Sequence, residues 1–93
     1  MVSVKVLLFA SLRDKYGIKE IVLNFDSTLN GFLNALKEKI GPGIIEDIFD
    51  PIKNQIKDNM IVTINGRNIK DIKGEIKFNE NDVIAIFPPL AGG

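Results

Sequence analysis

The chain has 93 residues, a length that fits one domain with a single core. Twelve basic and twelve acidic residues cancel to a formal net charge of zero, whereas nucleic-acid-binding domains usually carry a basic excess, so we expect no nucleic-acid partner. Cysteine and histidine are absent, which excludes disulfides, thiol nucleophiles, imidazole bases and the usual zinc ligands. We therefore expect a chain that binds no metal and no cofactor, and on which other proteins act.

The first ten residues alternate between apolar and polar side chains and lack a basic n-region and a long apolar core, which argues against a secretory signal. No apolar stretch approaches the roughly 20 residues of a membrane span. These features predict a cytoplasmic protein with no membrane partner.

The first half of the chain predicts a β-hairpin followed by a helix. Residues 2–9 and 20–25 alternate with period two, as strands do, and residues 10–18 predict a turn because they include polar residues and Gly17. Apolar residues from Leu29 to Ile40 then recur at helical spacing, after Ser27 or Thr28 as the N-cap and before a Gly-Pro-Gly stop over residues 41–43.

The second half predicts further strands after an irregular segment. Residues 44–59 favour one or two short helices, with Asp50 and Pro51 as a candidate helix start. Residues 60–64 read as a strand, the Asn-Gly pair at 65–66 as a hairpin turn, and residues 67–70 as a short return strand. Residues 79–82 read as a turn and residues 83–87 as the last strand, which two prolines end.

This order of elements predicts an α+β domain over residues 1–93. We expect a mixed β-sheet of four to five strands with one main helix packed on one face, and a flexible C-terminal tail over residues 88–93. The fold is a β-grasp if the last strand lies parallel beside the first, a pairing that periodicity alone leaves open.

The C-terminal residues have the properties of an extended tail whose terminal carboxylate can be activated. Two stiff prolines direct the chain off the last strand, and the six residues after Phe87 span roughly 20 Å when extended. A tail that ends in two glycines fits a narrow pocket, and its α-carboxylate can attack the α-phosphate of ATP to form an acyl-adenylate. A partner must then supply ATP and magnesium. The alternative is a frayed terminus without a function.

Three segments carry a family resemblance: Lys-Val-Leu-Leu-Phe-Ala-Ser-Leu-Arg-Asp over residues 5–14, Ile-Asn-Gly over residues 64–66, and Asn-Asp-Val-Ile-Ala-Ile-Phe-Pro-Pro-Leu-Ala-Gly-Gly over residues 81–93. With them the chain resembles the MoaD/ThiS family of ubiquitin-like sulfur carriers. The likeness is greatest to the small subunit of molybdopterin synthase (MoaD), in an archaeal style because residues 44–59 form a long, irregular segment.

The resemblance implies a ubiquitin-like β-grasp fold and a chain without an autonomous active site. Gly93 would be adenylated by an E1-like enzyme of the MoeB type with ATP and magnesium, and then converted to a thiocarboxylate. A large synthase subunit of the MoaE type would accept the tail and pass its sulfur to the molybdopterin precursor. The residues that would thread into the partner are Pro88, Pro89, Leu90, Ala91 and Gly92.

The resemblance also implies that Arg13 and Phe87 lie on the surface that meets a partner. Their alternatives are a solvated turn cation for Arg13 and a core position for Phe87. Three other roles remain open for the whole chain: a modifier conjugated to lysines through the same activated carboxylate, a sulfur carrier for tRNA thiolation, and a passive interaction module that does not use its tail.

Two charged clusters carry weaker signals. The acidic residues Glu46, Asp47 and Asp50 lack the spacing of a calcium loop. We therefore interpret them as a solvated helical face and not as a cation site. We interpret a second cluster, Lys70, Lys73 and Lys77, as solvated charges, with a docking patch for an acidic partner as the alternative.

Overall fold

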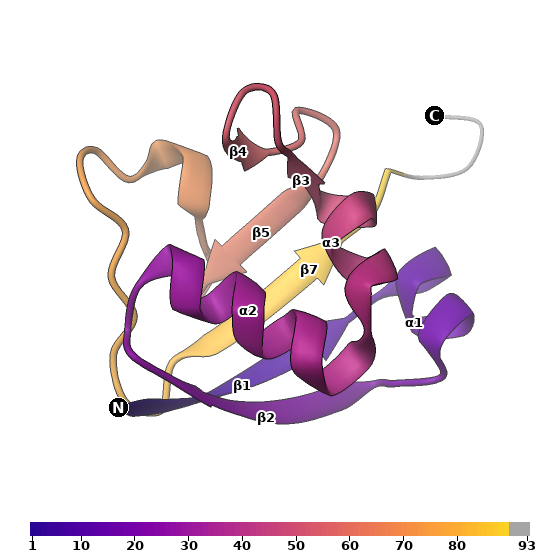
Figure 1. Cartoon of the computed structure of the whole chain (residues 1–93), viewed down its shortest axis with the longest axis horizontal. Coiled ribbons are helices and arrows are strands. Elements are labelled where there is room, and N and C mark those ends of the chain that lie inside the picture. The colour runs from indigo at the N-terminus through magenta and orange to yellow at the C-terminus, as the bar shows by residue number, and fades with distance from the viewer. Residues whose placement is uncertain (90–93) are drawn as a thin grey trace.

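The computed structural model describes residues 1–89, which form a five-stranded mixed sheet with helices on one face (Figure 1). The strand order is β2-β1-β7-β5-β6. The parallel pairing of β1 with β7 and the antiparallel pairing of the other neighbours confirm the predicted β-grasp. The five strands are β1 (Val2–Leu8), β2 (Glu20–Phe25), β5 (Ile61–Ile64), β6 (Arg67–Asn68) and β7 (Val83–Phe87).

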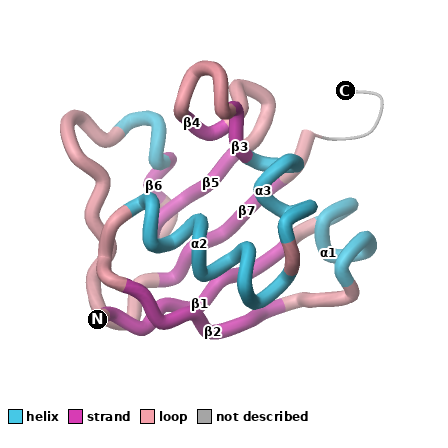
Figure 2. The backbone as a smooth tube through the Cα atoms, viewed as in Figure 1, coloured by secondary structure: helices cyan, strands magenta, loops and turns pink. Residues whose placement is uncertain are grey.

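The main helix, α2 (Leu29–Ile40), lies across one face of the sheet, as predicted (Figure 2). It begins at Thr28, whose hydroxyl oxygen accepts a hydrogen bond from the backbone N–H of Gly31 at 2.9 Å. Its apolar stripe is buried, and Phe32 stacks on Phe78, in the segment before β7, with ring centroids 4.9 Å apart. Thr28 rather than Ser27 is therefore the N-cap.

Strand alternation divides the sheet into a core face and an open face. The core side chains of the strands are Val4, Val6, Leu8, Leu23, Phe25, Val62, Ile84 and Ile86, each no more than 3% exposed. The open face, opposite α2, carries the half-buried or exposed alternate residues, among them Leu7, Val22 and Phe87. The period-two pattern of the sequence predicted this division.

A short helix, α1 (Ala10–Tyr16), stands where a turn was predicted. Leu12 buries its side chain against the core, and Gly17 ends the helix in the left-handed region, with φ 66° and its N–H donated to the carbonyl of Arg13 at 2.8 Å. The glycine that signalled a turn is therefore a helix C-cap. The prediction for residues 10–18 was wrong because a seven-residue helix with one buried side chain has almost no periodic signal.

The irregular segment contains one helix and a small hairpin. Helix α3 (Pro42–Ile48) starts with its proline directly after Gly41, and the two-residue strands β3 (Phe49–Asp50) and β4 (Gln55–Ile56) pair antiparallel. The predicted helix start at residues 50–51 is wrong. The Asp50 carboxylate instead accepts the N–H groups of Ile52 and Lys53, at 2.9 and 3.2 Å, inside the hairpin turn.

The predicted return strand over residues 67–70 is shorter than expected. Only β6 pairs with β5, and a single 3₁₀ turn, η1 (Ile69–Asp71), follows it. The Asn68 side chain accepts the N–H of Lys70 at 2.9 Å, which starts this turn. Within residues 1–89, no helix has the length and hydrophobicity that a membrane crossing requires.

Candidate functional site

The last strand holds the residue from which the C-terminal segment leaves the sheet. β7 is the central strand, with β1 on one side and β5 on the other (Figure 1). It ends at Phe87, Pro88 is half-buried, and Pro89 is exposed. Neither proline has an N–H to extend a ladder, so pairing stops where the sequence predicted.

An aromatic pair fixes this end of the strand. Phe9 and Phe87 stack with ring centroids 4.5 Å apart and an interplanar angle of 11°. The Phe9 N–H also donates to the carbonyl of Ile86 at 3.2 Å. Phe87 is half-buried rather than part of the core, so its core alternative is wrong. No contact in the structure tests its predicted role in meeting a partner.

An apolar surface, here called the end patch, surrounds the stacked pair on the open face. Leu7 lies opposite Ala85, and Ile61 lies opposite Phe87, in the strand registers. Ile61 is 47% exposed, a large fraction for a side chain of its size and hydrophobicity. The end patch consists of Leu7, Phe9, Ile61, Ala85 and Phe87.

Helix α1 places Arg13 at the same end of the sheet. The backbone N–H of Arg13 donates to the carbonyl of Phe9 at 3.5 Å, so the first turn of α1 is tied to the stacked pair. The Arg13 side chain is exposed. The structure therefore brings the two predicted partner residues, Arg13 and Phe87, to one end of the molecule through Phe9.

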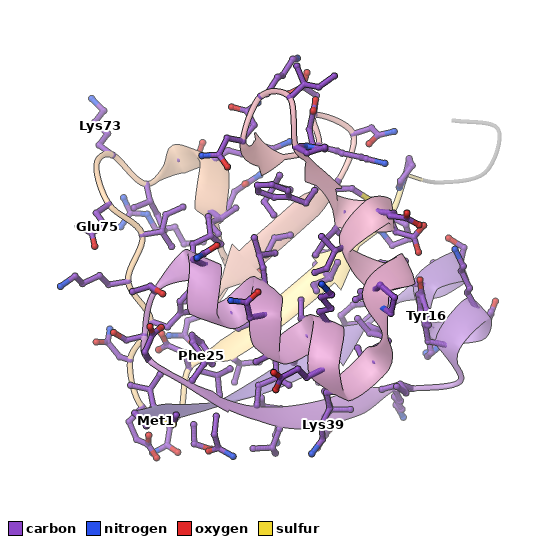
Figure 3. The ribbon with its side chains drawn as sticks, viewed as in Figure 1. Met1, Tyr16, Phe25, Lys39, Lys73 and Glu75 are labelled. Atoms are coloured by element: carbon purple, nitrogen blue, oxygen red, sulfur yellow. The ribbon has the colours of Figure 1, made fainter. Side chains whose placement is uncertain are left out.

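A hollow of about 280 Å³ lies beside the two prolines, bordered by α1, α3 and the loop before β5. Its charged lining includes Lys15, Asp47 and Lys57. The Asp47 carboxylate accepts hydrogen bonds from the Tyr16 hydroxyl, at 2.5 Å, and from the Lys15 ammonium, at 3.0 and 3.1 Å. These bonds join α1 to α3, and Figure 3 shows Tyr16 on α1 where the two helices approach.

This junction shifts the pKa values of its members. Burial raises the pKa of the Asp47 carboxyl, but the hydrogen bonds from Tyr16 and Lys15 outweigh burial and hold it below its usual value. Burial and the hydrogen bond to Asp47 raise the pKa of the Tyr16 hydroxyl. The hydrogen bond to Asp47 raises the pKa of the Lys15 ammonium. At neutral pH the junction therefore contains one carboxylate and two proton donors.

The two charged clusters of the sequence have structural roles that the pattern did not predict. Asp47 and Asp50 do not form a simple solvated face, because one joins two helices and the other organises a turn. The Lys70 ammonium is not only solvated: it donates to the carbonyls of Lys57, Asp58 and Met60, at 2.7, 2.9 and 3.1 Å. It thereby closes the loop before β5.

The remaining predicted site residues, Leu90, Ala91, Gly92 and Gly93, lie outside the described residues. Sequence reasoning missed the part that Phe9, Tyr16 and Asp47 take in this region. For Phe9 a signal existed, since it directly follows an alternating strand and is large and apolar. Tyr16 and Asp47 are 31 residues apart, and neither has a local pattern that pairs them.

The parallel pairing of the first and last strands, with α2 across one face, defines a ubiquitin-like β-grasp protein whose C-terminal segment leaves from the central strand. The model of the ThiS family matches residues 6–93. The chain therefore belongs to the ThiS family, as the terminal segments predicted.

Similar proteins carry two kinds of name. The chain is 32% identical over 95 residues to the molybdopterin synthase sulfur carrier subunit of Drosophila yakuba, covering 100% of this chain and 93% of that one. It is 27% identical to small archaeal modifier protein 3 of Haloferax volcanii, covering 98% and 99% of the two chains. The solution structure of small archaeal modifier protein 1 from Methanosarcina acetivorans superimposes with a TM-score of 0.77 at 30% identity, covering 100% and 98%.

Proposed function

We propose that the chain is a sulfur carrier whose working group is the carboxylate of Gly93. The observation that supports this most strongly is the position of the last strand: the C-terminal segment leaves from the centre of a ThiS-family β-grasp, beside a stacked aromatic pair. The names of the sulfur carrier relatives support the same role. The product we infer is molybdopterin, made with a large synthase subunit as partner.

The proposed chemistry has two steps, both within partner enzymes. A carboxylate oxygen of Gly93 attacks the α-phosphate of ATP, pyrophosphate leaves, and an acyl-adenylate forms. A hydrosulfide-equivalent nucleophile then attacks the acyl carbon, the C–S bond forms, the C–O bond to AMP breaks, and a thiocarboxylate remains. An E1-like partner would hold ATP and magnesium for the first step.

The end patch is the surface we assign to partner docking. It is apolar, it surrounds the residue from which the tail leaves, and exposed Arg13 stands next to it. A partner seated there would receive the tail over a distance of roughly 20 Å, the reach of the six residues after Phe87. Docking and threading would then be parts of one binding event.

A second candidate function is conjugation to lysines of other proteins. It is favoured by the relatives named small archaeal modifier proteins. The same acyl-adenylate serves both functions, since an amine in place of hydrosulfide gives an isopeptide bond. The two functions therefore differ in the nucleophile and not in the carrier.

Intact-mass spectrometry after incubation with an E1-like enzyme, ATP-magnesium and a sulfide source tests the proposal. We expect a mass gain equal to the exchange of one oxygen for sulfur, located at Gly93 by fragmentation. Ladders of lysine conjugates without thiocarboxylate would favour the modifier instead. A chain that forms neither product, and whose function survives deletion of Gly92 and Gly93, would be a passive interaction module.

The docking assignment has a matched pair of variants. Arg13→Ala removes the cation beside the end patch, and Arg67→Ala removes the other exposed arginine, which lies on β6. We expect Arg13→Ala to raise the KM for the carrier in the adenylation assay at least about threefold, with Arg67→Ala near wild type. Equal effects of the two variants would contradict the assignment.

A further inference from the structure

The two edges of the sheet differ in how they are protected. β6 is two residues long and includes Arg67, so it presents little backbone for pairing. β2, the other edge, has six residues, contains no proline, and exposes 50% of Val22. A six-residue edge strand without proline and with an exposed apolar side chain is a surface on which another strand can pair.

The hydrogen bonds show which β2 groups are directed outward. The N–H of Leu8 donates to the carbonyl of Lys19 at 3.1 Å, so these two residues form a hydrogen-bonded antiparallel pair. Such pairs alternate along a ladder, so the backbone groups of Glu20, Val22 and Asn24 are directed away from β1.

The neighbouring strand agrees with this assignment. The N–H of Lys5 donates to the carbonyl of Asp82 at 3.0 Å, on the β7 side of β1. Lys5 lies opposite Val22 in the register, and its N–H is therefore unavailable to β2. In the described residues, no strand lies beyond β2 to accept its outward groups.

The β2 sequence is complementary to itself in one antiparallel register. With Val22 opposite Val22 of a second copy, Glu20 lies opposite Asn24 and Asn24 opposite Glu20. All three pairs then use outward-directed N–H and C=O groups, giving six backbone hydrogen bonds. The side-chain pairs are one apolar contact at the centre and two carboxylate–amide pairs, with no like charges opposed.

The helix face beside this edge carries one acidic and one basic side chain. A hollow of about 330 Å³ lies between β2 and α2, with Ala35, Glu38 and Lys39 among its lining residues. Figure 3 shows Lys39 on the β2 side of the molecule. Glu38 and Lys39 carry opposite charges, and the formal net charge of zero imposes no overall repulsion between copies.

We propose that β2 is a dimerisation edge, at which a second copy of this chain adds its own β2 antiparallel across a two-fold axis at Val22. The product is a continuous ten-stranded sheet with both copies of α2 on one face. The two copies of β7 then run in opposite directions, so their C-terminal segments leave at opposite ends. The end patch of each copy remains uncovered, because its residues lie on β1, β5 and β7 and directly after β1, and none of them lies on β2.

Sedimentation equilibrium from about 10 µM to 1 mM tests the proposal, a range suited to a small, weak interface. We expect the mass to rise from 10.3 kDa toward twice that value. Val22→Glu places two like charges opposite each other across the axis, while within its own chain it faces Lys5, and it should raise the dimer dissociation constant at least about tenfold. Ile61→Glu is the matched control, since Ile61 is exposed to 47% on the same sheet face, and it should leave the constant unchanged.

Amide hydrogen exchange supplies a second measurement that needs no variant. The amides of Glu20, Val22 and Asn24 should become protected as concentration rises, whereas those of Ile21 and Leu23, directed to β1, should be protected throughout. A mass that stays at 10.3 kDa up to 1 mM, or exchange at Val22 that is independent of concentration, would overturn the proposal. The readouts do not involve Gly93, so this result is independent of the sulfur carrier proposal.

Discussion

Replacing Asp47 with asparagine tests the junction between α1 and α3. The change keeps the shape of the side chain but converts a charged acceptor to a neutral one. A hydrogen bond to a charged group contributes about 1.5–3 kcal/mol, and one between neutral groups about 0.5–1.5 kcal/mol. Because the Tyr16 hydroxyl lies 2.5 Å from the carboxylate, we expect Asp47→Asn to lower the free energy of unfolding by about 1–2 kcal/mol.

The pH dependence of this loss has a fixed sign. The folded pKa of Asp47 lies below its unfolded value of 3.8, so its contribution is present above pH 3.8 and disappears as pH falls through the folded pKa. The pKa of Tyr16 is raised above 10.0, so its contribution is present below pH 10.0 and is lost as pH rises through the folded pKa. The stability difference between wild type and Asp47→Asn should therefore be widest between these limits.

Thermal unfolding followed by circular dichroism from pH 2 to 8 measures this difference. A loss of 1–2 kcal/mol in a domain of this size lowers Tm by about 5–12 °C at pH 7. Glu46→Gln, an exposed carboxylate on the same helix, is the matched control and should leave Tm within about 2 °C. Equal effects of the two variants at pH 7, or a difference that persists undiminished at pH 2, would refute the reasoning.

Three further variants test single contacts by urea unfolding. Asn65→Ala removes a donor to the buried Asp82 carboxylate and puts alanine, which tolerates the left-handed region less well than asparagine, at φ 50°, so we expect a loss of about 2–3 kcal/mol. Lys70→Met leaves three loop carbonyls without their ammonium donor and should lower stability by about 1 kcal/mol. Gly31→Ala drives a β-carbon into the Asp26 carboxylate and should lower stability by about 1 kcal/mol despite the better helix propensity of alanine.

Each of these variants has an internal control. Asn65→Gly accepts the positive φ, so it should cost less than Asn65→Ala, and equal losses would assign the effect to the hydrogen bonds alone. Lys73→Met removes an exposed lysine in the next loop and should be neutral (Figure 3). In the Asp26→Ala background, Gly31→Ala should lose most of its cost, and additive losses would contradict the proposed clash.

The strands and the main helix were predictable because their patterns are local. Alternation in β1 and β2 and helical spacing in α2 are visible within one element, and Thr28 and Gly41 mark the ends of α2 in the sequence itself. The parallel pairing of β1 with β7 joins residues nearly 80 positions apart, for example Lys5 with Val83. Alternation cannot specify such a neighbour, and the family resemblance supplied it.

The missed elements share a physical cause. Helix α1 buries a single side chain, and β3 and β4 contain two residues each, so none of them repeats a buried position that would reveal its period. The Asp-Pro pair at residues 50–51 fits both a helix start and a turn, because each needs a carboxylate that accepts nearby backbone N–H groups. The antiparallel pairing of Phe49 with Ile56 distinguishes the two, because it makes the residues between them a hairpin turn and not a helix start.

The sequence predicted the part of the candidate site that depends on local residues, which is the end of the last strand. It did not predict the part that depends on the packing of strands distant in the sequence. The two prolines after Phe87 have no N–H to donate, so they end strand pairing in any fold. The stack of Phe9 on Phe87 depends on β1 and β7 being parallel neighbours, because only then do the C-terminal ends of both strands lie at the same end of the sheet. The sequence therefore located the exit of the C-terminal segment but not the aromatic pair that fixes it.

The central place of β7 has a mechanical consequence for a carrier whose tail is held by a partner. A pull on the C-terminal segment acts along β7, which has four register pairs with β1 and four with β5. Such a pull is resisted by both ladders at once, whereas a tail on an edge strand would be held by one ladder. The edge strand β2 does not pair with β7, so dimerisation there and threading of the tail are separable, and Val22→Glu should leave the proposed adenylation of Gly93 unchanged.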